Sequence, residues 1–329
     1  MSNGPQVAVV VGTGVIGTIY AAVLGEQGWG VRHLVRQGTS RARPKSVDVD
    51  LLDLRKGHKR HRRWNHEFCL TETFPADAEF VLVPVRLYQL DGVLKDLAAM
   101  PEKVTAVIFT TNWAGLSPLD EALPAGNYIL ADAIGGGAIT GNKLTATIKP
   151  LLPLGAVHPD AETRAESMRN VFTVAGLAPK HEQDILHWHW IQYALNAAMW
   201  PALVEAGTVR ALVKDNAQFQ RMLATVREAL RVCEARGVLV REYPEARVFL
   251  NEGSGVTGRV RSWIMREVYG TAVVHSDYHR RCMLHALSDP AEIATAYGAV
   301  LATGHELGCQ MTAFDSFKDS ITRFRQARR

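Results

Sequence analysis

The chain has 329 residues, of which 47% are hydrophobic and 21% charged, and its formal net charge is +4 at pH 7. These values exclude a disordered or fibrous protein and allow a large buried core, most simply divided between two domains. The first residues are polar, and the apolar run that follows is short and interrupted by glycine. We therefore expect neither a signal peptide nor a membrane anchor, but a soluble cytoplasmic protein.

Short apolar runs alternate with helical patterns through the first half of the chain. A helix is predicted at residues 18–28. Buried strands are predicted at residues 6–11, 31–35, 80–85, 106–111 and 128–133. This alternation is typical of βαβ units around a parallel sheet with helices on both faces, an α/β fold.

Three glycines, Gly12, Gly14 and Gly17, form the pattern G-x-G-x-x-G between the first predicted strand and its helix. The first glycine of such a pattern permits a tight turn, the second lets a pyrophosphate approach the backbone, and the third lets helix and strand pack closely. The N–H groups at the start of the helix, at Val15 and Ile16, would then bind the phosphates. The pattern predicts a dinucleotide site; the alternative is a glycine-rich turn without a ligand.

The second predicted strand is followed by Arg36, with Arg41 nearby, where NAD-binding proteins carry an acidic residue for the ribose 2′-hydroxyl. Because a guanidinium suits a 2′-phosphate, the sequence favours NADP(H) as the cofactor. The alternative is that Arg36 is a surface cation.

A basic run, RKGHKRHRR, covers Arg55 to Arg63. We interpret it as the solvated tip of a hairpin, and the alternative is a site for nucleic acid or another polyanion. The four cysteines lie far apart without a CxxC pair, so neither disulfides nor a zinc site are expected.

Beyond residue 180 the pattern changes to long helical segments without a convincing strand. They are predicted at about residues 183–205, 211–236, 257–269 and 290–307. We place the domain boundary so that an α/β domain covers residues 1–178 and an all-helical domain covers residues 179–329. The uncharged span from Ile185 to Val204 contains histidines and amides that would be costly in lipid, so it predicts a buried helix rather than a membrane helix.

Several further patches, in matching order, resemble the ketopantoate reductase (2-dehydropantoate 2-reductase) family of the 6-phosphogluconate-dehydrogenase-like group. FVLVPVRLYQ resembles the family's strand followed by K-A-Y-Q, with Arg86 in place of Lys and Gln89 retained, and FTTNWAGL resembles its Q-N-G stretch at Asn112. VAGLAPKHEQDI resembles the segment that joins the domains. WIQYALNAAMWPAL resembles W-x-K-L-x-x-N-x-x-x-N-P-L-T-A, and the segment from Cys282 to Gly308 resembles the S-M-x-x-D stretch and closing helix, about two residues shorter before Glu292.

The resemblance implies a Rossmann-type N-terminal domain, a helical C-terminal domain, and NADPH-dependent reduction of a small 2-oxo acid in a cleft between them. It implies that Arg86, Gln89 and Asn112 lie at the cofactor, with Asn112 beside the nicotinamide, and that Asn196 and Glu292 line the reacting centre. A homodimer is compatible with a helical domain of this size. Membrane contact is not expected, and nucleic acid is an unfavoured partner.

One stripe of the helix at 183–205 carries five candidate site residues, His189, Gln192, Tyr193, Asn196 and Trp200. In the family a Lys on this stripe donates the proton to the carbonyl oxygen, and Gln192 stands there in this chain. An amide hydrogen-bonds a carbonyl oxygen but releases no proton near neutral pH, so the general acid is lost at that position.

Three chemical hypotheses follow, besides that of a misaligned Lys elsewhere. His189 or Tyr193 supplies the proton; or the substrate is an imine that already carries its proton and needs an anionic neighbour such as Glu292; or the chain binds NADP(H) without strong catalysis. Taken alone, His189 is more simply a core histidine. Glu292 also fits a capping box that starts at Asp289.

Trp200 and Cys282 replace an Asn and a Ser of the family pattern, which indicates a less polar pocket. We therefore expect a substrate other than ketopantoate, with a genuine 2-dehydropantoate 2-reductase as the alternative. An alternative of another class is an NADP(H)-sensing binding protein that uses the basic run Arg55 to Arg63 for its partner. The histidines near the C-terminal helices, with Tyr278, lack regular ligand spacing, so no metal is expected.

Overall fold

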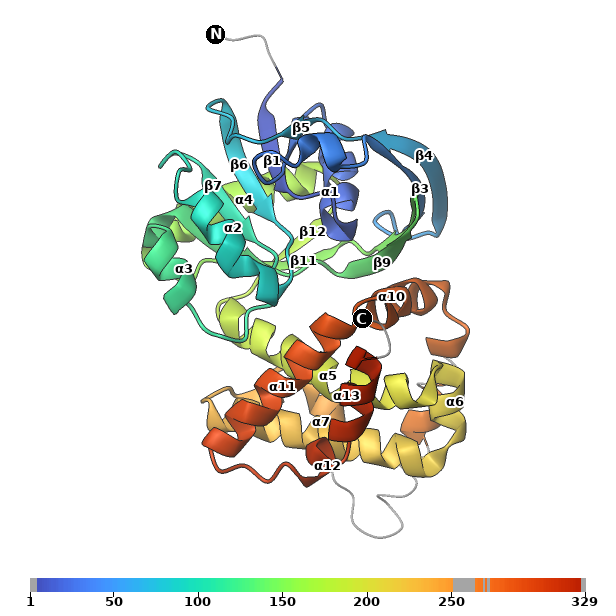
Figure 1. The fold of residues 1–329 in the computed structure, drawn as a ribbon. Coiled ribbons are helices and arrows are strands. Elements are labelled where there is room, and N and C mark those ends of the chain that lie inside the picture. The colour runs from blue at the N-terminus through green and yellow to red at the C-terminus, as the bar shows by residue number, and fades with distance from the viewer. Residues whose placement is uncertain (1–4, 251–263, 269, 271–272, 327–329) are drawn as a thin grey trace. The chain divides into compact units, whose positions relative to one another are not determined.

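The computed structural model describes residues 5–250, 264–268, 270 and 273–326. The chain divides into two compact units, Met1–Leu186 and His187–Arg329 (Figure 1). Each unit is described by itself. The boundary after residue 178 remains a proposal for the functional domains.

The first unit is built on an eight-stranded sheet of order β12-β11-β8-β7-β6-β1-β2-β5 (Figure 1). The five strands predicted from apolar runs form its parallel centre: β1 (Val7–Val11), β2 (Gly30–Leu34), β6 (Ala78–Val83), β7 (Thr105–Ile108) and β8 (Tyr128–Ala131). The sheet is completed by β5 (Leu70–Thr71), β11 (Leu151–Gly155) and β12 (Ala178–His181). Only β11 joins the central strands in an antiparallel manner, at β8. The predicted α/β class of this half is confirmed.

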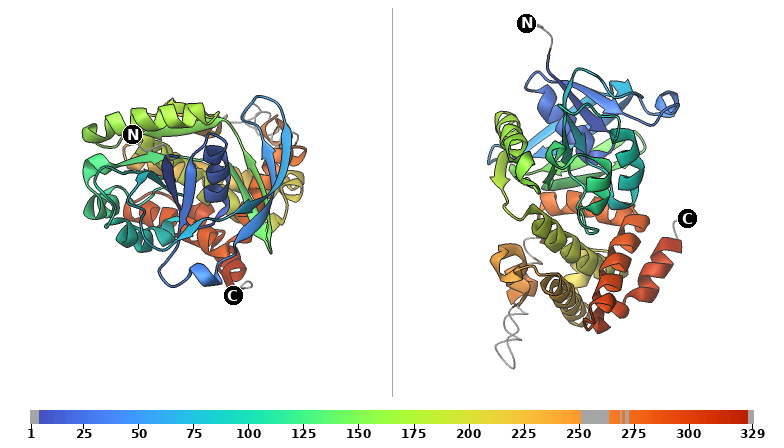
Figure 2. Two further views of the ribbon diagram at one scale, coloured as in Figure 1. Left: turned by 90° about the horizontal axis from the view of Figure 1, so that it is seen from above. Right: turned by 90° about the vertical axis from the view of Figure 1, so that its left-hand side faces the viewer.

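Helices cover both faces of this sheet. They are α1 (Val15–Gly25), α2 (Leu90–Leu97), α3 (Ser117–Ala122) and α4 (Glu162–Val174). Tyr20 of α1 contacts Phe172 of α4 with their ring centroids 6.1 Å apart, so these two helices share a face. Figure 2 shows α2 and α3 on the other face. The helices lie on opposite faces because the crossover connections are right-handed. The connection from β1 to β2 moves toward one edge of the sheet, and the connections from β6 to β7 and β8 move toward the other edge.

A second, four-stranded sheet packs against α1, and the sequence patterns did not predict it. Its order is β4-β3-β10-β9, formed by β3 (Ser46–Asp53), β4 (Arg60–Glu67), β9 (Gly135–Thr140) and β10 (Lys143–Ile148). The basic run therefore lies in the turn between β3 and β4 and in β4 itself, as expected for a hairpin. It is not simply solvated, however, because the Arg55 side chain is only 5% exposed and pairs with Asp53 at 2.7 Å and with Glu26 at 3.0 Å.

The second unit contains only helices among its described residues. They are α5 (Ile185–Ala206), α6 (Val209–Lys214), α7 (Asn216–Ala235), α8 (Pro244–Leu250), α10 (Asp277–Ser288), α11 (Pro290–Glu306), α12 (Thr312–Asp315) and α13 (Lys318–Gln326). The predicted helices at 183–205 and 290–307 are α5 and α11. The segment predicted as one helix at 211–236 breaks at Asp215, whose carboxylate accepts a hydrogen bond from the Gln218 N–H and caps α7. Most of the segment predicted at 257–269 lies outside the described residues.

Within the described part of the chain, none of the helices is both long enough and apolar enough to span a membrane. The uncharged helix α5 agrees with this, since polar side chains recur along it and its residues from Ile185 to Leu203 are mostly buried in the fold.

Candidate functional site

The glycine turn lies at the carboxyl end of β1. This strand is hydrogen-bonded to β2 on one side and to β6 on the other, so the chain order reverses across it. Open α/β sheets bind ligands at the carboxyl ends of their strands, at such a reversal. The turn between Val11 and Val15 therefore occupies the position where a ligand is expected.

The three glycines differ in what the fold requires of them. Gly12 has φ of +78°, a conformation that favours glycine. At Gly17 an added Cβ would lie 2.7 Å from Val10 Cγ1 and 3.2 Å from Pro84 Cγ, so the helix could not pack against the strand. Gly14 has φ −78° and ψ 177°, which any residue adopts, and an added Cβ would meet nothing within 4 Å. The fold gives no reason for a glycine at Gly14, whereas a pyrophosphate lying against the backbone does.

His33 of β2 holds this turn through a hydrogen bond, a role that no sequence pattern indicated. Its Nδ1 donates a hydrogen bond to the Gly12 carbonyl at 2.8 Å, while the Gly12 N–H donates to the Leu34 carbonyl at 2.8 Å. The His33 side chain is buried, and its ring contacts those of His66 and Phe68. Burial lowers the pKa of His33, so the neutral ring with its proton on Nδ1 holds the turn near neutral pH.

Replacing His33 by phenylalanine removes this donor but keeps a flat ring of similar size. The Gly12 carbonyl then loses its partner, which we expect to lower the free energy of unfolding by about 1–3 kcal/mol and to weaken dinucleotide binding about tenfold. Urea unfolding and a fluorescence titration with NADPH measure the two effects. The control is His66→Phe, which changes the neighbouring ring without touching Gly12. Equal losses of affinity in both variants would contradict the role given to His33.

The other predicted cofactor residues of the first unit follow strands next to β1. Arg36 comes after β2 and is exposed. Its guanidinium extends to Gly92, in the first turn of α2: a Cβ added to Gly92 would lie 3.5 Å from Arg36 Nη2. After β6, Gln89 Oε1 accepts a hydrogen bond from the Arg86 N–H at 3.2 Å, so Gln89 also closes the local turn. After β7, Asn112 is buried and its Nδ2 donates to the Gly115 carbonyl. The sheet thus brings these residues to one edge, at the ends of four adjacent strands.

The predicted stripe of the second unit divides into two parts on α5. His189 and Tyr193 are buried, with 0% and 7% of their surfaces exposed, whereas Gln192, Asn196 and Trp200 are half-buried. The last three are spaced by four residues and share one partly open face of the helix. This face, rather than the whole stripe, is accessible to a small molecule within the unit.

Two carboxylates lie near this part of α5. Gln192 Nε2 donates a hydrogen bond to Glu245 Oε1 of α8 at 3.4 Å, a contact that sequence spacing did not indicate. Burial, and then the charge of Glu292, raises the pKa of Tyr193 well above its ordinary value, which makes this hydroxyl a weaker acid. Of the two proposed proton donors, Tyr193 is therefore the less suited.

Glu292 itself lies in the first turn of α11. Asp289 caps this helix as expected, because its Oδ1 accepts hydrogen bonds from the N–H groups of Ala291 at 2.9 Å and Glu292 at 3.1 Å, and Pro290 occupies the first helical position. Cys282, on α10, is half-buried and forms no disulfide. The structure thus brings Glu292 to Tyr193 and Gln192 to Glu245.

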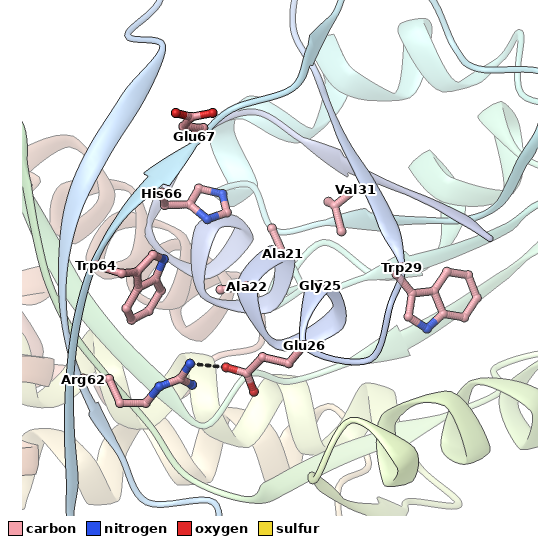
Figure 3. A pocket seen from close by; sticks show the side chains of 10 residues that line it. All are labelled: Ala21, Ala22, Gly25, Glu26, Trp29, Val31, Arg62, Trp64, His66 and Glu67. Atoms are coloured by element: carbon pink, nitrogen blue, oxygen red, sulfur yellow. Dashed lines mark ion pairs between the residues drawn. The ribbon is translucent and has the colours of Figure 1, made fainter. Parts of the chain in front are cut away.

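A hollow of about 460 Å³ opens between α1 and β4 of the first unit (Figure 3). Trp29 and Trp64 line it, and Arg62 pairs with Glu26 inside it while its guanidinium lies 5.2 Å from the centre of the Trp64 ring. Its Arg62 and Glu26 charges satisfy each other, and none of the three motif glycines lines it. We therefore assign it no part in the cofactor site. Among the described residues, no group of three or more His, Cys, Asp or Glu side chains could hold a metal ion.

Comparisons with known proteins agree with this arrangement. Residues 8–141 match the family model described as "Ketopantoate reductase PanE/ApbA". No curated protein matches the chain in sequence.

Solved structures match along nearly the whole chain. A 2-dehydropantoate 2-reductase from Geobacter metallireducens GS-15 is similar with a TM-score of 0.71 and 15% identity, over 96% of this chain and 99% of that one. D-mandelate dehydrogenase with NADH and anilino(oxo)acetate has a TM-score of 0.70 and 12% identity, over 98% of both chains. A dimeric ketopantoate reductase from Staphylococcus aureus has a TM-score of 0.67 and 14% identity, over 98% and 99%. At such identities these structures show a shared fold.

The Rossmann-like α/β unit followed by helices is the fold of these proteins, as predicted. The resemblance stated from the sequence is confirmed: residues 8–141 match the ketopantoate reductase family model, and the fold of solved ketopantoate reductases extends over nearly the whole chain.

Proposed function

We propose that the chain is an NADPH-dependent oxidoreductase that transfers hydride to the C=O or C=N carbon of a small 2-oxo-acid-like or imine substrate other than ketopantoate. The observation that carries the proposal is Gly14, a glycine that neither backbone conformation nor packing requires, at the turn where the sheet order reverses. Support comes from D-mandelate dehydrogenase, a protein of the same fold whose structure holds NADH.

The choice of NADPH rests on Arg36 and Arg41. Both are exposed after β2, and no ion pair of the described residues engages either of them. Two guanidinium groups near the end of β2 favour a 2′-phosphate over a bare ribose hydroxyl. When bound, NADPH supplies the hydride; Asn112 would orient the nicotinamide and the substrate.

The second unit would hold the substrate. Gln192 and Asn196 offer amide groups on the open face of α5 and would hydrogen-bond the reacting group, while Glu292 would stabilise positive charge on it. His189, although buried, remains the proposed proton donor for a carbonyl substrate. Trp200 and Cys282 would give the pocket a less polar wall. A homodimer is proposed from the dimeric relative of the same fold.

The basic run Arg55 to Arg63 does not favour a polyanion partner. Arg55 and Arg62 pair with Glu26 and Asp53, and Arg63 pairs with Asp50 at 3.3 Å, so much of its charge is compensated within the fold. A phosphate backbone would have to compete with these carboxylates. Three of the six Lys and Arg side chains of this run are thus engaged within the fold, which weakens the NADP(H)-sensing alternative.

The proposal is tested by mixing the protein and NADPH with a panel of 2-oxo acids, cyclic imines and amine plus 2-oxo acid pairs. We expect the near-ultraviolet absorbance of NADPH to fall with at least one member other than ketopantoate. Brisk turnover of ketopantoate would show that the reaction does not need the Lys that the family carries at the position of Gln192. Tight NADPH binding without turnover of any member would favour the sensor.

A further inference from the structure

The turn that follows β2 has a defined shape. The Thr39 N–H and Oγ1 both donate to the Arg36 carbonyl, at 3.1 and 2.6 Å, and Gly38 has φ of +75°. A closed turn with a positive φ at its third residue is a type II turn, which favours glycine there. Arg36, the residue proposed to meet the 2′-phosphate, is the first residue of this turn.

The turn is held by Glu72, a residue that is not part of the nucleotide-binding motif. It follows β5, the edge strand beside β2, and its carboxylate accepts hydrogen bonds from the Gly38 N–H at 2.9 Å and the Ser40 N–H at 2.8 Å. Hydrogen bonds from the side chain of Ser40 and from both N–H groups, together with the charge of Arg41, lower the pKa of Glu72 to about 2. The carboxylate is therefore ionised, and its hydrogen bonds are of the strong, charge-assisted kind.

These contacts limit how the turn can bind a phosphate. The N–H groups of Gly38, Thr39 and Ser40 already have acceptors within the fold. A 2′-phosphate therefore cannot take them without breaking existing bonds, and the side chains of Arg36 and Arg41 must carry its recognition. Their reach depends on where the turn places their backbone, and Glu72 holds that turn through the N–H groups of Gly38 and Ser40.

We propose that Glu72 is a positioning residue for cofactor selectivity. It holds the Arg36–Ser40 turn so that Arg36, and Arg41 directly after the turn, meet the 2′-phosphate of NADPH. The inference rests on the proposed function, because it needs a dinucleotide at the glycine turn. NADH has no phosphate at this position, so its binding depends little on the turn. The selectivity between the two cofactors, rather than affinity in general, is the property that Glu72 controls.

The test compares the dissociation constants of NADPH and NADH, measured by fluorescence titration, in the wild type, Glu72→Ala, Glu72→Gln and Glu79→Ala. For Glu72→Ala we expect the NADPH constant to rise about tenfold and the NADH constant to change by less than about twofold. Glu72→Gln keeps one acceptor oxygen and should lie between the wild type and Glu72→Ala. Glu79 is exposed on β6, so Glu79→Ala removes the same charge away from the turn and should change neither constant.

Several results overturn the inference. Tighter NADPH binding in Glu72→Ala would mean that the carboxylate only repels the phosphate, and an equal loss for both cofactors would mean a purely structural role. Hydrogen exchange at the Gly38 and Ser40 amides reports whether the turn has loosened, whatever the activity. If the wild type itself binds no dinucleotide, or prefers NADH, the proposed function fails and this inference fails with it; failure in the variants alone leaves the proposed function standing.

Discussion

Gly14→Val is expected to abolish dinucleotide binding while leaving the fold intact. The backbone at Gly14 is extended, and a Cβ there would meet no atom beyond its chain neighbours within 4 Å, so the fold leaves open space for a side chain at this position. The methyl groups of the valine would fill the space in which a pyrophosphate must approach the N–H groups at the start of α1. We expect the affinity for NADPH to fall by at least about 100-fold, with an unchanged thermal midpoint.

The matched control is Gly17→Ala, three residues further along. Its methyl group would overlap Val10 and crowd Pro84, so this variant should lower the thermal midpoint clearly. Calorimetry and NADPH titration of both variants separate the two roles. A Gly14→Val protein that unfolds as early as Gly17→Ala, or that still binds NADPH like the wild type, would remove the main support for a cofactor at this turn.

Gln192→Lys is expected to raise kcat/KM for ketopantoate by at least about 100-fold. General acids contribute about 10²- to 10⁴-fold to rate, and an amide at this position cannot supply the proton. The half-buried position of Gln192 on the open face of α5 gives a lysine room to reach the reacting group. Initial rates of NADPH consumption with ketopantoate measure the effect.

Glu245 makes this prediction sharper, because it accepts the hydrogen bond of Gln192. A lysine beside this carboxylate would have a raised pKa and be a weaker acid, so adding Glu245→Gln to Gln192→Lys should increase the rate further. The control Gln192→Leu removes the amide without adding an amine and should not reduce ketopantoate. If wild type and Gln192→Lys reduce ketopantoate equally well, the account of the missing proton donor is wrong.

The main sheet could be predicted from the sequence because its central strands are buried on both faces. β1, β6, β7 and β8 are therefore continuous apolar runs, which are visible without any partner. The second sheet was missed because β4 alternates exposed and half-buried residues and is rich in Arg and His, so its pattern resembled a charge cluster. β9 begins with three glycines, which are poor strand formers.

The candidate site was predictable where spacing along the chain defines it. The glycines of the turn and the face of α5 follow from local patterns. His33, Glu72 and Glu245 did not, because each acts through a contact that forms only on folding. His33 on β2 contacts Gly12 after the neighbouring strand β1, and Glu72 after β5 contacts Gly38 after β2. Glu245 is 53 residues from Gln192 in the chain. The predicted stripe of α5 also proved to have a buried part and a half-buried part. Periodicity predicts in which direction a side chain points, but not whether other parts of the fold cover it.

The most direct test of the central claim is a crystal structure of the protein with NADPH bound. We predict density for the pyrophosphate against Gly14, within hydrogen-bond distance of the N–H groups of Val15 and Ile16, and for the 2′-phosphate beside Arg36. A crystal soaked with NADPH that shows no dinucleotide, or one seated in the hollow between α1 and β4, would contradict it.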